Sequence, residues 1–185
     1  MPTLLESRLA HGSSAVAGEG AFCRETIAAG EIVAFALAGR PVGRVEYETI
    51  DWTRYAGRIM QIGEDTFLEG TGDVVDFINH SCEPNIGFDA SGQYFLALRD
   101  LVQGEEVFFD YSTSEDEEGW RVPCSCGSAR CRGAITGFRD LPATEKARLL
   151  PISLPYLRQT YGSTLSGGDG RRRSSDPPGS GDQPA

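Results

Sequence analysis

The sequence predicts a mainly β domain. Short apolar runs separated by glycines and other turn residues recur along it, for example Ala21 to Cys23, Ile32 to Phe35 and Tyr94 to Leu98, and this pattern is typical of short strands. Little of the chain shows helical periodicity. The 185 residues suit one domain and a tail, since a domain of about 150 residues buries roughly 70% of its unfolded surface.

A glycine-rich segment, Gly18-Glu19-Gly20, precedes the first of these runs. Glycines on both sides of Glu19 allow the backbone to approach a ligand closely, although the same pattern also occurs in ordinary turns. Cys23 has no other cysteine near it in the sequence, so we expect it to be buried as a small apolar residue.

The region from Arg40 to Gly72 is interrupted by a proline and several glycines. These residues break the region into short pieces. Only Ile59 to Ile62 and Thr66 to Leu68 have the apolar, β-branched or aromatic character that predicts strands.

The stretch from Asp76 to Asn85 combines more kinds of side-chain chemistry than a core strand requires. Its Asn79-His80-Ser81 tripeptide brings donors and acceptors that must be satisfied wherever they lie. Cys82 brings a soft metal ligand, and the Pro-Asn pair that follows favours a turn. Taken alone, the stretch also fits a strand or helix that ends in a polar turn.

Two further unusual segments follow. In Glu105 to Tyr111, two glutamates precede an apolar run, Val107 to Phe109, which predicts a strand that ends in Asp110-Tyr111. The other segment places three thiols within eight residues, at Cys124, Cys126 and Cys131. A tetrahedral structural zinc site requires four ligands. The alternative is free cysteines, or a disulfide between Cys124 and Cys131.

The end of the chain changes character. Thr144 to Leu150 predicts a short helix with Thr144 as its N-cap and Pro151 at its end, and Ser153 to Thr160 predicts a further turn or two. From Gly162 onward almost no apolar residue remains. This tail cannot offset the entropy of ordering, so we expect it to be disordered.

In this order, the glycine-rich, Asn-His-Ser-Cys, Glu-Glu…Asp-Tyr and cysteine-rich segments resemble the SET-domain family of protein lysine methyltransferases. The resemblance runs from about Gly12 to Tyr161. It implies a SET-domain fold of several small curved sheets, in which a pseudoknot brings Tyr111 to Asn79 and His80. The implied divisions are a SET domain (12–115), a zinc-binding post-SET segment (116–137), a segment of short C-terminal helices (138–161) and the disordered tail (162–185).

The resemblance also implies site residues. The residues expected at the methyl-transfer centre are Tyr111, Phe109 and Tyr55. The residues expected to contact S-adenosylmethionine are Gly18, Glu19, Gly20, Asn79, His80 and Tyr111. A structural Zn²⁺ is expected on Cys82, Cys124, Cys126 and Cys131, where neighbouring arginines would offset the charge of four thiolates.

The roles of several aromatic residues stay open between two alternatives. The second active-site tyrosine is open between Tyr55, which we prefer, and Tyr47, because Arg58 falls where family members usually carry it. Trp120 and Phe138 flank the cysteines, and each suits either a cover over the cofactor or lysine channel or the core of the tail.

The expected function is S-adenosylmethionine-dependent protein-lysine N-methylation. Family members carry Phe or Tyr at the position of Phe109, and Phe leaves room for further methyl groups, so we expect di- or trimethylation. The alternative is a catalytically inactive SET-like zinc module that binds a peptide or protein partner.

Charge narrows the expected partners. The formal net charge of -10 disfavours direct binding to nucleic acid, which needs clustered Lys and Arg, and suits a basic, lysine-containing peptide. The first twenty residues contain no long apolar run, so neither a secretory signal nor a membrane span is predicted. We expect a monomer or weak dimer in the cytoplasm, or in the nucleus of a eukaryotic cell.

Overall fold

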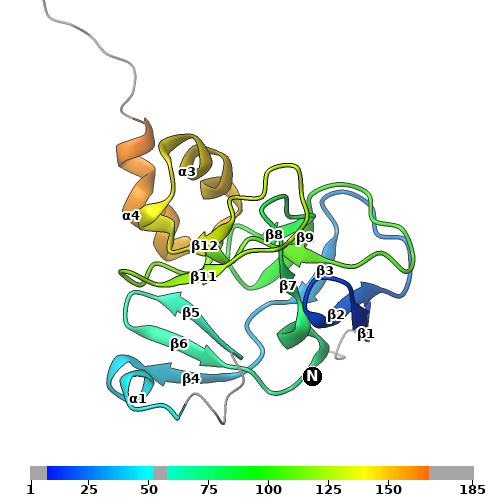
Figure 1. Ribbon diagram of the computed structural model, residues 1–185, viewed down its shortest axis with the longest axis horizontal. Helices are drawn as coiled ribbons and strands as arrows, with labels where there is room; N and C mark the ends of the chain where they lie inside the picture. Colours follow the sequence, from blue (N-terminus) through cyan, green and yellow to red (C-terminus); the bar gives the residue numbers. More distant parts are fainter. Residues whose placement is uncertain (1–7, 52–57, 167–185) are drawn as a thin grey trace, which may run out of the picture.

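A computed structural model of the chain describes residues 8–51 and 58–166, with side chains up to residue 163. Within these residues, strands predominate and form five small sheets, with helices α3 and α4 at the C-terminal end and α1 beside β4 (Figure 1). The prediction of a mainly β fold with several small sheets is confirmed.

The sheets contain two or three strands each. β1 (Leu9–Ser14) and β2 (Gly18–Cys23) form an antiparallel hairpin. One three-stranded antiparallel sheet has the order β3 (Ile32–Phe35), β9 (Tyr94–Ala97) and β8 (Ile86–Phe88). Another has the order β4 (Arg40–Gly43), β6 (Thr66–Glu69) and β5 (Ile59–Gly63). The last two are a parallel pair of β7 (Asn79–His80) and β10 (Phe108–Phe109), and an antiparallel pair of β11 (Arg121–Pro123) and β12 (Ala134–Thr136).

The helices are short. The α-helices are α1 (Arg44–Glu48), α3 (Ala143–Leu149) and α4 (Pro155–Ser166). Single 3-10 turns lie at Val74–Phe77, Tyr111–Thr113, Phe138–Asp140 and Leu150–Ile152.

The C-terminal helices differ from the prediction at their ends. The predicted N-cap at Thr144 was wrong: α3 begins at Ala143 after Pro142, because the fixed φ of proline already starts the turn. Helix α4 continues to Ser166, past the predicted end of the helical segment at Tyr161. The remainder of the predicted disordered tail lies outside the described residues.

Two apolar cores hold these elements together. The larger one joins the sheets through fully buried side chains that include Ile27, Ile86 and Leu101, and it contains Cys23 at 2% exposure, as predicted. The smaller one packs the C-terminal helices around Phe138, Leu141, Leu149 and Leu157. Each such side chain contributes about 1.5–3 kcal/mol by leaving water, so the C-terminal segment is an integral part of the fold.

The parallel pair of β7 and β10 connects segments almost thirty residues apart. In its register, Phe108 lies beside Asn79 and Phe109 beside His80. The segment that follows β7 is also bound to β10 through Asn85. The Asn85 N–H donates to the Phe108 carbonyl at 3.1 Å, and the Asn85 side-chain oxygen accepts the Phe108 N–H at 2.7 Å. The chain after β10 therefore emerges beside the Asn79–Cys82 segment.

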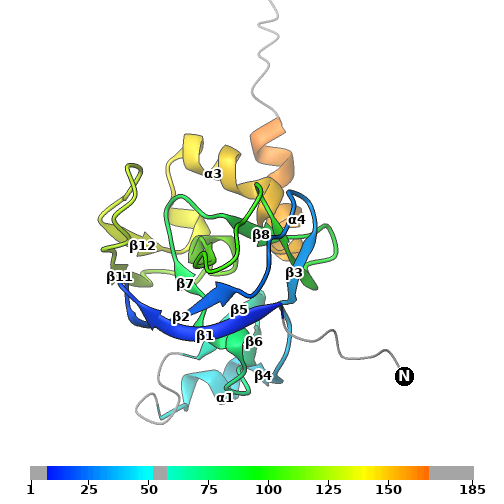
Figure 2. The same cartoon turned by 90° about the vertical axis from the view of Figure 1, so that its right-hand side faces the viewer.

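An ion pair fixes the cysteine-rich loop to the end of β10. Arg132 donates two hydrogen bonds to the fully buried carboxylate of Asp110, at 2.6 and 2.8 Å. Charge-assisted bidentate pairs of this kind are strong and directional. Figure 2 shows the β11–β12 hairpin at one side of β7, with the β1–β2 hairpin crossing in front.

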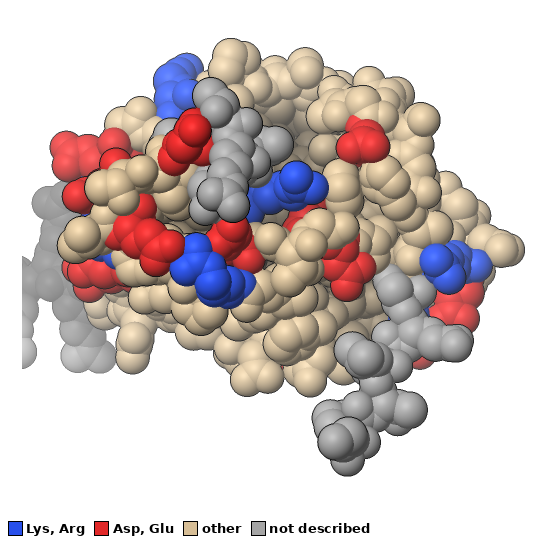
Figure 3. Space-filling model, turned by 90° about the horizontal axis from the view of Figure 1, so that it is seen from below, with Lys and Arg blue, Asp and Glu red and all other residues tan. Residues whose placement is uncertain are grey.

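The described surface carries mixed charge. On the face in Figure 3, basic side chains lie close to acidic ones, and ion pairs on β4 and α1 join Arg40 to Glu69 and Arg44 to Glu117. None of the described helices has the length and apolar character needed to cross a bilayer.

Candidate active site and metal centre

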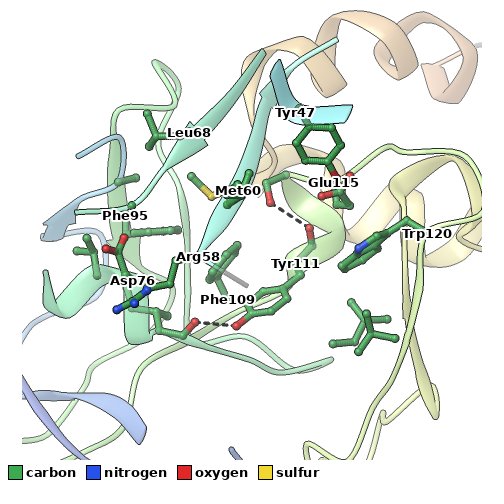
Figure 4. A pocket seen from close by; sticks show the side chains of 18 residues that line it. Tyr47, Arg58, Met60, Leu68, Asp76, Phe95, Phe109, Tyr111, Glu115 and Trp120 are labelled. Atoms are coloured by element: carbon green, nitrogen blue, oxygen red, sulfur yellow. Dashed lines mark hydrogen bonds between the residues drawn. The ribbon is translucent and has the colours of Figure 1, made fainter. Parts of the chain in front are cut away.

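A pocket of about 390 Å³ lies between the β4–β6–β5 sheet and the segment that follows β10 (Figure 4). Its walls are mostly apolar and aromatic, and they include Phe109, Tyr111, Tyr47 and Trp120. A volume of this size and a lining of this kind are typical of sites that enclose a small group or a side chain.

Tyr111 occupies one wall of the pocket and is held at both ends. Its hydroxyl donates to the Ile78 carbonyl at 3.0 Å, and its backbone N–H donates to His80 Nδ1 at 3.1 Å. Burial raises the pKa of Tyr111 to about 12, so the phenol stays protonated. Because its one proton is given to Ile78, the lone pairs of the oxygen remain available to accept from a guest. Tyr111 thus contacts His80 and Ile78, the two residues that flank Asn79 in the chain.

Phe109 supplies an apolar wall beside Tyr111. It is 8% exposed, and its ring lies 4.8 Å from that of Tyr111 and 5.1 Å from that of Phe95, measured between centroids. Packing of rings at these distances fixes their positions. The pocket is therefore lined by carbon on the side of Phe109.

The alternative second tyrosine, Tyr47, lines the pocket from α1. Its ring is stacked on that of Phe67 with centroids 3.6 Å apart. Tyr55, the preferred candidate, lies outside the described residues. Arg58 also lines the pocket just before β5, where family resemblance leads us to expect a tyrosine.

The predicted cofactor segments meet around the side chain of Asn79. Its amide donates to the Glu19 carbonyl at 2.7 Å and to Glu106 at 2.9 Å. A Cβ on Gly20 would lie 2.4 Å from the same Glu106 carboxylate, so a larger residue at position 20 would have to displace this carboxylate. The structure thus joins β2 to β7, and Glu106 is a member of this cluster that sequence reasoning did not single out.

Thiols from two distant segments of the chain lie close together. Cys82 Sγ lies 3.8 Å from Cys124 Sγ, and Cys131 Sγ lies 3.7 Å from Cys124 Sγ. Cys126 belongs to a group with His80, Cys82 and Cys124 whose ligand atoms all lie within 4.8 Å of one another. In a tetrahedral zinc site with Zn–S bonds of about 2.3 Å, the sulfurs are about 3.8 Å apart, so the distances of Cys82 and Cys131 from Cys124 fit Zn²⁺. Cys131 is not a member of the group within 4.8 Å, in which His80 is the fourth residue.

The alternative of a disulfide does not fit. All five cysteines are free, and the 3.7 Å between Cys124 and Cys131 far exceeds the roughly 2.05 Å of a disulfide bond.

His80 lies against this cluster but is suited to donate to it rather than to ligate. Its Nε2 lies 3.3 Å from Cys82 Sγ. Burial lowers the pKa of His80 to about 4, so the ring is neutral, and its Nδ1 accepts the Tyr111 N–H. The proton must then be on Nε2, where it points at the sulfur. His80 therefore connects the thiol cluster to Tyr111.

A buried carboxylate, Glu115, lies in the pocket wall four residues after Tyr111. It is 8% exposed, and it accepts the Glu117 N–H at 3.2 Å. Burial, together with the nearby charges of Glu117 and Asp116, raises its pKa to about 7. In sequence it belongs to a run of four acidic residues, a pattern normally read as a solvated loop, so only its burial distinguishes it.

The flanking aromatic residues separate in the structure. Trp120 lines the pocket, whereas Phe138 is fully buried in the smaller core. Of the two interpretations that the sequence left open, Trp120 fits the channel and Phe138 fits the core of the C-terminal segment.

Comparison with known proteins supports the resemblance. Residues 18–112 match the SET domain. Similar proteins include histone-lysine N-methyltransferase trithorax of Drosophila virilis (37% identical over 131 residues) and histone-lysine N-methyltransferase 2B of Homo sapiens (32% over 145 residues), each alignment covering 64% of this chain. An H3 lysine-4 specific histone-lysine N-methyltransferase of Cryptococcus neoformans is 32% identical over 143 residues, or 69% of this chain.

The chain spans 3%, 5% and 10% of the length of these three relatives. Because the SET match covers more than half of its residues, the chain belongs to the SET-domain family. SET methyltransferases use S-adenosylmethionine as the methyl donor.

The raised pKa of Glu115 predicts a dependence of stability on pH. In the unfolded chain this carboxyl has its ordinary pKa of 4.5, whereas in the folded protein its pKa is about 7. Between these values the folded protein keeps a proton that the unfolded chain has released, so stability falls as pH rises through this window. As pH rises through this range, the free energy of unfolding of Glu115→Gln should increase relative to that of wild type, by up to about 1.4 kcal/mol per pH unit.

Urea unfolding at several pH values measures this difference. Glu118→Gln is the matched control, because the Glu118 side chain is 89% exposed, and its stability should follow that of wild type. A difference between wild type and Glu115→Gln that stays constant with pH would contradict the assignment.

Proposed function

We propose that this chain is an S-adenosylmethionine-dependent protein-lysine N-methyltransferase that adds two or three methyl groups. The observation that carries the proposal is the placement of Tyr111, whose hydroxyl is fixed by Ile78 and whose backbone is fixed by His80, in an apolar pocket. The names of the relatives support a protein lysine as the acceptor, and the net charge of -10 favours a basic substrate.

The reaction is an in-line displacement, so its rate depends on holding donor and amine face to face without water. S-adenosylmethionine, when bound, supplies a methyl group on a positively charged sulfonium. Gly18, Glu19 and Gly20 of β2 would hold it together with Asn79 and the backbone of His80. These segments fit this role because Asn79 already joins them and Gly20 provides the close approach.

The acceptor amine must lose its proton before it reacts, and an unperturbed lysine has a pKa of about 10.4. Enclosure in a pocket with apolar walls disfavours the ammonium and lowers that pKa. The Tyr111 oxygen, with its proton directed to Ile78, would orient the amine and accept weak C–H contacts from the methyl group. Tyr47, or Tyr55 beyond the described residues, would complete the aromatic wall.

The role of the proposed zinc site is structural. Zn²⁺ on Cys82, Cys124, Cys126 and Cys131 would hold the cysteine loop against the segment that also carries Asn79 and His80. The backbone N–H of Arg132 donates to Cys82 Sγ at 3.4 Å, and such outer contacts stabilise thiolate ligands.

We expect one zinc per chain, and loss of this zinc when Cys82, Cys124, Cys126 or Cys131 is replaced by Ser. Cys23→Ser, which removes the cysteine of the larger core, should retain the metal. Elemental analysis measures the content, and calorimetric titration with S-adenosylmethionine measures the consequence. Removal of the metal by a chelator should abolish binding of cofactor or peptide; a metal-free protein with full activity would contradict the role.

Tyr111→Phe should reduce methyl transfer by about 100-fold or more, a typical loss when a preorganised polar contact to the transition state is removed. Transfer of labelled methyl to lysine peptides or to a cell lysate measures the rate. Tyr94→Phe removes a hydroxyl from β9, outside the pocket lining, and should retain activity. Binding of S-adenosylmethionine without any transfer by wild type would favour an inactive module instead.

Phe109→Tyr should confine the product to monomethyl-lysine, because the added hydroxyl would hold water in the space that a further methyl group needs. Phe35→Tyr on β3, at a side chain that is 46% exposed, is the control for the same chemical change. Mass spectra over a time course distinguish the products. Only monomethyl product from wild type would refute the proposed methylation state.

A further inference from the structure

Glu115 differs from the acidic residues that follow it, because it has no cation beside it. Asp116 is paired with Arg139 at 3.5 Å and accepts from the Tyr161 hydroxyl at 3.0 Å. Glu117 is paired with Arg44 at 2.6 Å. Among the described residues, Glu115 takes part in no ion pair, and it is nevertheless 8% exposed.

The groups around Glu115 do not compensate its negative charge. Burial raises the pKa of the Tyr47 hydroxyl from α1 and of the Tyr156 hydroxyl from α4, and the charge of Glu115 raises both further. The charges that act on the pKa of Glu115 are those of Glu117 and Asp116, both negative, and both raise it. A buried carboxylate is normally paired or neutralised, so this position is favourable for a positive charge that is supplied by a ligand.

Glu115 lines the pocket, so a cationic group of a ligand in the pocket can reach it. Figure 4 shows Glu115 beside Tyr47, with Trp120 on the same side of the pocket, while the Tyr111 hydroxyl points the opposite way towards Ile78. The other charged residues of the lining, Asp76 and Arg58, lie on the far side. The pocket therefore has one end suited to the target amine and a second, acidic and aromatic end.

We propose that Glu115, together with the rings of Tyr47 and Trp120, binds a cationic side chain of the substrate close to the target lysine. It is thereby a specificity-determining residue that favours substrates with arginine near that lysine. A carboxylate supplies the opposite charge, and aromatic faces attract guanidinium and ammonium groups. This inference rests on the proposed methyl transfer for the identity of the substrate, but it concerns binding and can be tested separately.

The test uses peptides with a central lysine and one arginine placed at each of three positions on either side, in a background of alanine, glycine and serine. Each peptide is paired with one that carries citrulline, which has the shape of arginine without its charge. Dissociation constants are measured by fluorescence anisotropy in the presence of S-adenosylhomocysteine, and methyl transfer is measured on the same peptides.

At one or two positions, wild type should bind the arginine peptide about 10-fold more tightly than the citrulline peptide, as expected for about 1.4 kcal/mol from one desolvated charge. In Glu115→Gln this preference should fall to within about twofold, a loss of at least about 1 kcal/mol of that energy. Glu118→Gln, an exposed control of the same charge change, should keep the preference.

Absence of the preference in wild type, or its persistence in Glu115→Gln, would overturn the inference. So would a uniform fall in turnover on all peptides with the preference unchanged, since Glu115 would then accept a proton rather than recognise the substrate. Failure of the proposed function has a different signature: no peptide is methylated by wild type, whereas the binding preference still reports on Glu115.

Discussion

The pairing of β7 with β10 is the contact on which the site depends. Ser81 donates its N–H to the Phe109 carbonyl at 3.2 Å, and Asn85 brackets Phe108 from the other end. A two-residue parallel pair would not persist alone, because parallel strands need a long crossover whose closure costs entropy. It is maintained by what lies on either side of it, namely the β2 segment and the cysteine loop.

Both functional regions share this segment. Ile78 receives the Tyr111 hydroxyl, Asn79 contacts β2, His80 contacts both Tyr111 and Cys82, and Cys82 is a member of the thiol cluster. Four of the five residues from 78 to 82 therefore contact Tyr111 in the pocket wall, the expected cofactor segment or the expected metal site. A change at the cysteine loop would reach Tyr111 through His80 by direct contact, without any long pathway.

Sequence reasoning found the parts that carry distinctive chemistry. The thiol spacing predicted a metal centre and the ordered motifs predicted the SET domain, because few other arrangements require those residues. It missed β4, in which Pro41 lies in a strand that pairs with β6. Local pattern argues against a strand at such a proline, and only the long-range pairing with β6 overrides it.

The sequence could not show Glu115. An acidic run normally faces water, whereas this one side chain is buried near residues far away in the chain, Tyr47 of α1 and Tyr156 of α4, whose hydroxyls feel its charge. The same holds for the Arg132–Asp110 pair, which joins residues 22 apart in sequence. Such contacts are consequences of the fold.

The shared segment is tested most directly by amide hydrogen exchange at Ser81 and Tyr111, whose N–H groups donate to Phe109 and His80. Exchange is compared between zinc-loaded and metal-free protein, with the Leu101 amide, bonded to Ile27 in the larger core, as internal reference. Loss of metal should increase exchange at Ser81 and Tyr111 and leave Leu101 protected. Unchanged protection of Ser81 and Tyr111 in protein verified to be metal-free would contradict the coupling.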